Sequence, residues 1–249
     1  MSQTLADFSA ERADFDRVLG GVRAILSAPK EALLSLDWLG GMIREVGLVP
    51  IPDAGTTYEG EEDYINGTQQ GLIQLPREFA RWLLMLAEHR PATYLEIGCF
   101  NGATASLAAA YLSRLVQGAR VVTCDIFPAF LFYSLVNDFV PFEYHVGKTS
   151  CDFAKESFEA VFIDGDHSFE WSWADYQNVG RRARLCALHD VNNAPYRDLH
   201  LGGVCGVWEL IREAEAGPDI EFHEFFEHPS REIMGIGVRV RRAAGPDAG

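Results

Sequence analysis

The chain of 249 residues is long enough for one substantial α/β core with an extension, and too short for two large domains. Its 21 basic and 36 acidic residues give a formal net charge of −15, which repels phosphate backbones and anionic lipid and argues against nucleic acid and membrane partners. It has no apolar run of the ~20 residues that a membrane span needs, and residues 1–23 are too acidic and polar for a signal peptide. The predicted location is the cytoplasm. The five cysteines include no C-x-x-C pair, which predicts reduced thiols rather than a zinc cluster or a disulfide framework.

Residues 1–71 are predicted to form an N-terminal helical extension with a connecting loop. Apolar side chains recur at helical spacing over 8–26 and 30–46, and Pro29 suits the first turn of the second helix. Residues 49–71 are rich in Gly, Pro, Thr and acids, which is typical of a loop or a flexible lid. The extension could pair subunits in a homo-oligomer or cover a site, and the sequence leaves both roles open.

Residues 72–242 are predicted to form one α/β domain, because extended and helical segments alternate along them. The predicted strands are 93–97, 120–125, 142–146, 160–163, 184–189, 221–227 and 233–241. The predicted helices are 76–88, 104–116, 129–137, 169–181 and 204–215. This order predicts a Rossmann-like, mostly parallel seven-stranded sheet with helices on both faces and a C-terminal antiparallel β-hairpin. Residues 243–249 are predicted to be a disordered tail.

The turn after the first predicted strand, Glu96 to Gly102, is the candidate ligand platform. Gly98 and Gly102 permit a tight turn and a close backbone approach, and the next helix offers its unpaired N–H groups. A dinucleotide-binding turn needs glycines at positions 98, 100 and 103, but Phe100 and Ala103 occupy the last two. A nicotinamide oxidoreductase is therefore disfavoured.

The same turn resembles the first motif of class I S-adenosylmethionine-dependent methyltransferases, an acidic residue followed by glycines at +2 and +6, which Glu96, Gly98 and Gly102 match. The resemblance implies that Glu96 supports the methionine end of the donor, directly or through water, and that the glycines lie under its ribose and methionine carbons. Without the resemblance, Glu96 could simply cap the next helix and the glycines could be turn residues.

A second match lies at the end of the second predicted strand. The resemblance implies that Asp125 accepts hydrogen bonds from both ribose hydroxyls of the donor, with Ile126 as a neighbouring cofactor contact. Gly147, after the third strand, resembles the start of the loop that flanks the adenine. Together with the first motif, Asp125 favours S-adenosylmethionine as the cofactor.

Polar side chains also follow the fourth and fifth predicted strands. Asp164 ends the fourth strand, and His189 and Asp190 end the fifth. If these strands are neighbours, their ends lie about 5 Å apart, so Asp164 and Asp190 can share a cation. Two carboxylates with an amide or water oxygen favour Mg²⁺, Mn²⁺ or Ca²⁺ over zinc, and Asn192 or a water could complete the shell.

This pattern resembles the metal-dependent O-methyltransferases that act on sugars, phenols and antibiotic scaffolds, in which an acid after the fourth strand and an acid pair or acid–amide pair after the fifth hold Mg²⁺. The pair here is His189–Asp190. His189 is predicted as a third metal residue, with the alternative that it is buried and holds a backbone carbonyl, since Mg²⁺ prefers oxygen ligands.

The resemblance implies transfer of the donor methyl group to a hydroxyl of a small molecule, a sugar or a secondary metabolite, with the metal lowering the pKa of that hydroxyl. His167 is the first candidate for the base, because an unperturbed imidazole titrates near ~6.5 and a subset of the sugar-modifying enzymes carries a histidine at this offset. Asp166 is the alternative base. Residues 164–168 could instead be a loop that caps the next helix.

Two other functions on the same scaffold stay open. A cephalosporin-hydroxylase-like enzyme shares the acids at the strand ends, and donor binding without methyl transfer would indicate it. A non-catalytic module that binds the nucleoside ligand is compatible with the fold, but Asp164, His167 and Asp190 argue against it.

Overall fold

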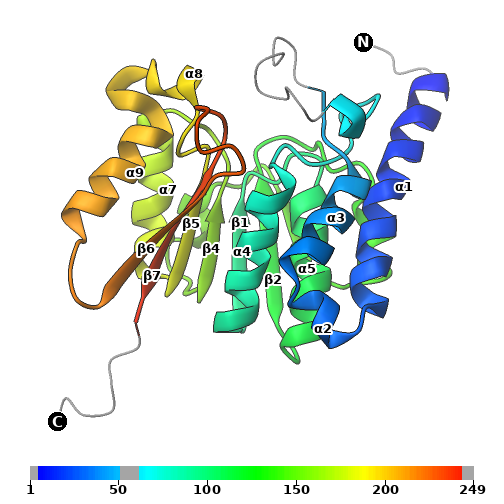
Figure 1. Ribbon diagram of the computed structural model, residues 1–249, viewed down its shortest axis with the longest axis horizontal. Helices are drawn as coiled ribbons and strands as arrows, with labels where there is room; N and C mark the ends of the chain where they lie inside the picture. The colour runs from blue at the N-terminus through cyan, green and yellow to red at the C-terminus, as the bar shows by residue number, and fades with distance from the viewer. Residues whose placement is uncertain (1–4, 51–61, 243–249) are drawn as a thin grey trace. The chain divides into compact units, whose positions relative to one another are not determined.

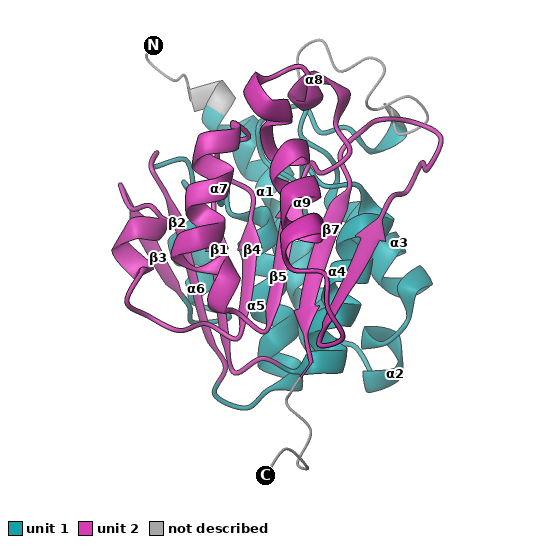
Figure 2. Cartoon of the chain, turned by 90° about the vertical axis from the view of Figure 1, so that its left-hand side faces the viewer, with its two compact units in different colours: residues 1–90, 99–118, 128–142 teal, residues 91–98, 119–127, 143–249 magenta. Residues whose placement is uncertain are grey.

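The computed structural model describes residues 5–50 and 62–242 (Figure 1). The chain forms two compact units, which Figure 2 distinguishes by colour. Residues up to 90, 99–118 and 128–142 belong to the first unit, and residues 91–98, 119–127 and those from 143 onward belong to the second. The predicted division at residue 71 stays a prediction, and the predicted tail 243–249 and part of the predicted loop, 51–61, lie outside the described residues.

The first unit is built from helices. They are α1 (Leu5–Ser27), α2 (Lys30–Leu33), α3 (Leu36–Val46), α4 (Pro76–His89), α5 (Ala103–Leu115) and α6 (Tyr133–Asn137), with a short 3-10 helix η1 (Glu62–Tyr64). The prediction of one helix over 30–46 is wrong, because Ser35 adopts an extended conformation and its hydroxyl accepts a hydrogen bond from the amide of Trp38 at 3.2 Å. Such a cap starts a new helix, so α2 and α3 are separate.

The second unit contains a seven-stranded sheet in the order β3–β2–β1–β4–β5–β7–β6. Its strands are β1 (Thr93–Ile97), β2 (Arg120–Asp125), β3 (Glu143–Val146), β4 (Ala160–Ile163), β5 (Leu185–His189), β6 (Ile220–Phe225) and β7 (Ile236–Arg241). Strands β1 to β5 pair in parallel, and β7 pairs antiparallel with both β5 and β6. The predicted Rossmann-like fold with its C-terminal hairpin is confirmed.

Helices α7 (Phe169–Asn178) and α9 (Gly203–Ala214) pack against each other on one face of this sheet (Figure 1). Buried apolar side chains of β1, β2, β4 and β5 meet those of the two helices, among them Trp208 of α9. A Cβ at Gly237 of β7 would lie 2.6 Å from the Trp208 indole, so a glycine here lets the ring lie on the sheet. Each aliphatic side chain fully buried in this layer contributes about 1.5–3 kcal/mol.

The connections of the second unit contain shorter elements that the sequence pattern did not predict. They are α8 (Ala194–Arg197) and the 3-10 helices η2 (Ser150–Phe153), η3 (Gly180–Arg182) and η4 (His200–Gly202). All five cysteines are free thiols, as predicted, and four of them are buried. No helix within residues 5–50 and 62–242 is long and apolar enough to cross a membrane.

The strand order reverses at β1, which has β2 on one side and β4 on the other. In open α/β sheets ligands bind beyond the carboxyl ends of the strands at such a switch point. The carboxyl ends of β1 to β5 are therefore the edge at which a functional site is expected.

Candidate active site

The carboxyl ends of β1, β2 and β3 lie side by side and form one half of this edge. Beyond β1, the amide of Gly98 donates to the carbonyl of Cys124 at 2.9 Å. Beyond β3, the amide of Gly147 donates to the carbonyl of Asp125 at 2.8 Å. The structure thus brings together Gly98, Asp125 and Gly147, three residues predicted from the sequence as donor contacts.

Gly98 is required by its surroundings as well as by its backbone conformation. Its φ is +82°, and a Cβ at this position would lie 2.2 Å from the carbonyl oxygen of Asp164. Only glycine therefore lets the turn after β1 approach the loop after β4 so closely. This backbone contact connects the candidate donor site to the first of the predicted metal residues.

Exposed apolar side chains adjoin Asp125. Ile126 and Phe127 are 56% and 66% exposed, and Val146, which pairs with Asp125 across β2 and β3, is 48% exposed. One carboxylate oxygen of Asp125 accepts a hydrogen bond from the amide of Phe127 at 2.9 Å. An exposed apolar patch beside a carboxylate can bind a nucleoside, because the apolar side chains can contact the nucleobase and the carboxylate can accept hydrogen bonds from the ribose.

Glu96 lies deeper than the sequence motif suggests. It is fully buried, and its Oε2 accepts a hydrogen bond from the Tyr94 hydroxyl at 3.0 Å. Gly102 belongs to the first unit, where a Cβ would lie 2.2 Å from the ring of Phe130, so this glycine makes room for an aromatic side chain. The predicted contacts of Glu96 and Gly102 to the donor stay predictions.

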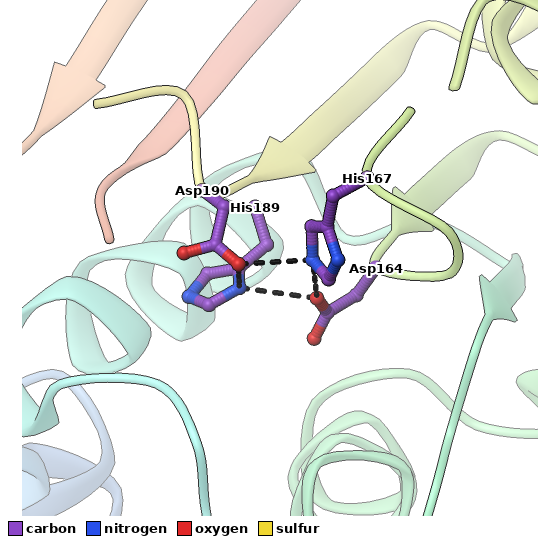
Figure 3. A group of neighbouring side chains, drawn as sticks. All are labelled: Asp164, His167, His189 and Asp190. Carbon is purple, nitrogen blue, oxygen red and sulfur yellow. Dashed lines mark hydrogen bonds and ion pairs between the residues drawn. The ribbon is translucent and has the colours of Figure 1, made fainter. Parts of the chain in front are cut away.

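Four ionisable side chains meet beyond the ends of β4 and β5, and we call them the Asp–His cluster: Asp164, His167, His189 and Asp190 (Figure 3). His189 Nδ1 donates to Asp164 Oδ1 at 3.0 Å and lies 3.3 Å from Asp190 Oδ2. His167 Nε2 lies 2.9 Å from Asp190 Oδ2 and 3.6 Å from Asp164 Oδ1. One donor atom from each residue lies within 4.8 Å of the other three. The parallel pairing of β4 with β5 is what brings the two strand ends together.

The backbone at Asp190 explains how two consecutive residues reach one cluster. Side chains along a strand alternate between its faces, so His189 and Asp190 would ordinarily point apart. Asp190 has φ +62°, a left-handed conformation that ends this alternation. The side-chain amide of Asn193, through Nδ2, then donates to Asp190 Oδ1 at 2.8 Å. Backbone hydrogen bonds between residues 191–194 and 232–235 hold this turn.

His167 is held by two further contacts. Its ring stacks on Tyr196 with the centroids 4.3 Å apart and the planes inclined by 2°. Its carbonyl accepts a hydrogen bond from the amide of Val204 at 2.9 Å, and a Cβ at Gly203 would lie 2.7 Å from the same oxygen. These contacts fix the imidazole beside the carboxylates.

Electrostatics and burial compete in the cluster. Burial alone raises the pKa of a carboxyl and lowers that of an imidazole. For Asp164 and Asp190 the neighbouring histidines outweigh burial, so both carboxyl pKa values are lowered, that of Asp190 far below its usual range. Against the same opposing burial, the two carboxylates raise the pKa of His167 to about 9 and that of His189 well above its ordinary value. Two imidazolium and two carboxylate groups therefore balance in charge.

The oxygen and nitrogen atoms that the cluster offers as metal ligands fit a divalent cation. A dication would displace the two imidazole protons and leave the net charge of the cluster unchanged. Ligands about 2.1 Å from one ion lie about 3.0 Å apart at right angles and about 3.4 Å apart at a tetrahedral angle. The separations of His189 Nδ1 from Asp164 Oδ1 and from Asp190 Oδ2, 3.0 and 3.3 Å, agree with these values.

Two residues that the sequence proposed for this site lie outside the cluster. Asp166 is exposed, and its Oδ1 accepts a hydrogen bond from the backbone amide of Ser168 at 2.8 Å. The side chain of Ser168 and then this amide lower the pKa of the Asp166 carboxyl. The backbone bond reaches the residue just before α7, whose N-cap, Ser168, makes no capping hydrogen bond with its own side chain. Asn192 donates to the carbonyl of Arg231 at 3.0 Å, whereas the next residue, Asn193, contacts Asp190.

Sequence reasoning also missed residues that support the cluster. Asn193 and Tyr196 lie in the segment after β5, where the sequence pattern predicted no element. The sequence offered only a weak indication of their role, namely an amide and an aromatic side chain a few residues after His189–Asp190. The alternative that His189 holds a backbone carbonyl is wrong for Nδ1, which donates to Asp164.

Comparison with known proteins places the fold. The chain matches no model of a known protein family and no curated protein. It is similar in structure to the O-methyltransferase from Bacillus cereus solved in complex with SAH, with a TM-score of 0.50 and 18% identity over 64% of this chain and 78% of that one. It is also similar to the O-methyltransferase TomG from Streptomyces achromogenes, involved in tomaymycin synthesis and solved with SAM, with a TM-score of 0.52 and 17% identity over 79% of this chain and 92% of that one. The fold is that of the class I methyltransferases.

Proposed function

We propose that this chain is an S-adenosylmethionine-dependent, metal-assisted O-methyltransferase that acts on a hydroxyl of a small molecule. The observation that carries the proposal is the sheet edge itself, where Asp125 and its apolar neighbours adjoin the turn at Gly98, whose backbone meets that of Asp164. The similarity of fold to O-methyltransferases solved with SAH and SAM supports it. The net charge of −15 favours a small acceptor over nucleic acid.

The donor would bind over the ends of β1 to β3. Asp125 would accept hydrogen bonds from the ribose hydroxyls, since a carboxylate accepts without donating. Ile126 would contact the nucleoside through its exposed side chain, and Gly98 and Gly147 would allow close approach of the backbone. Glu96, fully buried, would act on the methionine end only through an intermediary such as water.

The cation would be held by Asp164, His189 and Asp190, with Asn193 keeping the Asp190 carboxylate in place. When bound, such an ion lowers the pKa of an acceptor hydroxyl and orients it toward the methyl group. His189 and Asp190 are only 1% and 3% exposed, so their side chains have little space in which to reorient. The site is therefore preorganised for its ligand.

His167 would accept the proton. The acceptor oxygen attacks the methyl carbon, the carbon–sulfur bond breaks to leave S-adenosylhomocysteine, and the hydroxyl proton passes to the imidazole. Its side chain is 24% exposed, so it can meet an acceptor that the buried His189 cannot reach. Without an ion the two carboxylates favour the protonated imidazole. A dication held by Asp164, His189 and Asp190 would offset their negative charge and oppose protonation of His167, so that the ring could act as a base.

Methyl-labelled S-adenosylmethionine tests this function when it is supplied with a panel of hydroxylated sugars and phenols, with and without a chelator. We expect label transfer to an acceptor oxygen that the chelator suppresses, and that Asp164→Asn lacks. Donor binding without transfer to any acceptor would contradict the proposal and favour the hydroxylase-like enzyme or the nucleoside-binding module.

A further inference from the structure

The Asp–His cluster differs from a metal site made of oxygen ligands alone, because His189 adds a nitrogen atom. Its Nδ1 lies 3.0 Å from Asp164 Oδ1 and 3.3 Å from Asp190 Oδ2. Both separations match those of neighbouring ligands around one ion at about 2.1 Å. A cation bound to the two carboxylate oxygens can therefore bind this nitrogen at the same time.

The imidazole of His189 has no room to leave the cluster. Its side chain is 1% exposed, and its residue pairs with Ile236 of β7. On the other side, the preceding Leu188 pairs with Ile163 of β4. Pairing on both sides fixes the backbone at the end of β5, and burial leaves the His189 ring little space in which to turn away from the two carboxylates.

We infer that the ion held here belongs to the borderline transition dications, Mn²⁺, Fe²⁺, Co²⁺ or Zn²⁺, with His189 Nδ1 as a ligand, in preference to Mg²⁺ or Ca²⁺. The inference rests on the proposed metal site and differs from the magnesium that the two carboxylates alone predict. Mg²⁺ demands oxygen ligands in near-octahedral geometry and keeps several waters, whereas imidazole is a preferred ligand of the transition ions. Two carboxylates and one fixed nitrogen leave open positions for an acceptor hydroxyl.

Cobalt tests the inference because the visible absorption of Co²⁺ changes when protein ligands replace water, so binding is measured without an acceptor or turnover. The metal-free full-length protein is titrated with Co²⁺ alone, with Mg²⁺ alone, and with Co²⁺ in the presence of excess Mg²⁺. We expect Co²⁺ to bind at least about 100-fold more tightly than Mg²⁺, and its spectrum to persist in a large excess of Mg²⁺. Displacement of Co²⁺ by Mg²⁺ at a comparable concentration would overturn the inference.

His189→Asp sharpens the test, since it replaces the nitrogen by a carboxylate and creates the acid pair of the magnesium-dependent enzymes. We expect this variant to bind Mg²⁺ more tightly and Co²⁺ more weakly than the unaltered protein. His223→Gln on β6, whose histidine pairs with the nearby Glu221, is the matched control and should bind both ions unchanged. An unchanged preference for Co²⁺ in His189→Asp would show that the nitrogen is not a ligand.

The outcomes separate this inference from the proposed function. If His189→Asp does not fold, as circular dichroism would reveal, the competition in the unaltered protein decides alone. Tight Co²⁺ binding without any methyl transfer would contradict the proposed function and leave the inference intact. Metal-dependent methyl transfer with a preference for Mg²⁺ would do the reverse.

Discussion

The two halves of the sheet's carboxyl edge are built in different ways. At the ends of β1 to β3 the site is made of backbone, with Gly98 and Gly147 at positive φ and their amides bonded to the neighbouring strand. At the ends of β4 and β5 it is made of buried charged side chains that balance one another, including Asp164 and His189. The first half depends on backbone conformations that favour glycine and on the close approach at Gly98, and the second half depends on the pairing of opposite charges. Substitutions at the glycines should therefore mainly lower the free energy of unfolding, whereas substitutions in the Asp–His cluster should mainly lower turnover.

Removing one charge from the Asp–His cluster should have the largest effect. Asp190→Asn keeps the side-chain shape and tolerates the left-handed backbone, so it tests the charge alone. We expect turnover to fall about 10³-fold while the affinity for S-adenosylmethionine is unchanged. Steady-state kinetics and calorimetry measure the two quantities. Asp198→Asn, at an exposed acid after α8, is the control, and equal activity of the two variants would refute a role for Asp190.

Substitution of His167 should be the next most damaging. His167→Gln removes the base but leaves the three proposed metal ligands, so we expect kcat to fall about 10²-fold with little change in metal affinity. Metal titration and kcat are measured on the same preparation. A parallel loss of metal affinity would contradict the role of base and make His167 a ligand.

At the ends of β1 to β3, Gly98→Ala and Gly147→Ala form a matched pair of substitutions. They distinguish the cost of a steric clash from the cost of placing a Cβ at positive φ. Both glycines have positive φ, but a Cβ at Gly98 would meet the Asp164 carbonyl at 2.2 Å, whereas a Cβ at Gly147 has no neighbour within 4 Å among the described residues. We expect Gly98→Ala to lower the free energy of unfolding by about 2–5 kcal/mol and Gly147→Ala by about 1–2 kcal/mol. Urea denaturation measures both, and equal losses would contradict the packing role of Gly98.

A smaller, pH-dependent effect is expected at Asp175 on α7. Burial raises the pKa of this carboxyl to about 6, above its unfolded value of about 3.9. The folded state therefore binds more protons, so stability is highest below pH 4 for this group and falls as the pH rises through 6. Asp175→Asn should remove this loss and stabilise the protein at pH 7.5 by on the order of 1–3 kcal/mol. Unfolding at pH 5 and pH 7.5 measures it, and a variant no more stable at the higher pH would refute the shift.

The parts of the molecule that sequence predicts well are those that depend on local pattern. Alternating strands and helices predicted the sheet and its hairpin, and the positions of Gly98 and Asp125 on neighbouring strand ends followed from that order. The break at Ser35 was missed because apolar spacing continues across it while a single hydroxyl caps the next helix.

The cluster was harder to predict because its details depend on one dihedral angle. The left-handed backbone at Asp190 turns its carboxylate toward His189. The residues around this aspartate do not predict that conformation. The same turn decides that Asn193, and not Asn192, contacts Asp190. The stacking of Tyr196 on His167 depends on how the segment after β5 folds back, which only tertiary packing determines.

The most direct test of the central claim is calorimetric titration of S-adenosylmethionine and S-adenosylhomocysteine into the unaltered protein, Asp125→Ala and the surface control Asp219→Ala. We predict one specific site in the unaltered protein and in Asp219→Ala, and an affinity about 10²-fold weaker in Asp125→Ala, since two hydrogen bonds to a charged acceptor are lost. Binding by neither ligand, or equal affinity in Asp125→Ala, would contradict the assignment of the donor site at the ends of β1 and β2.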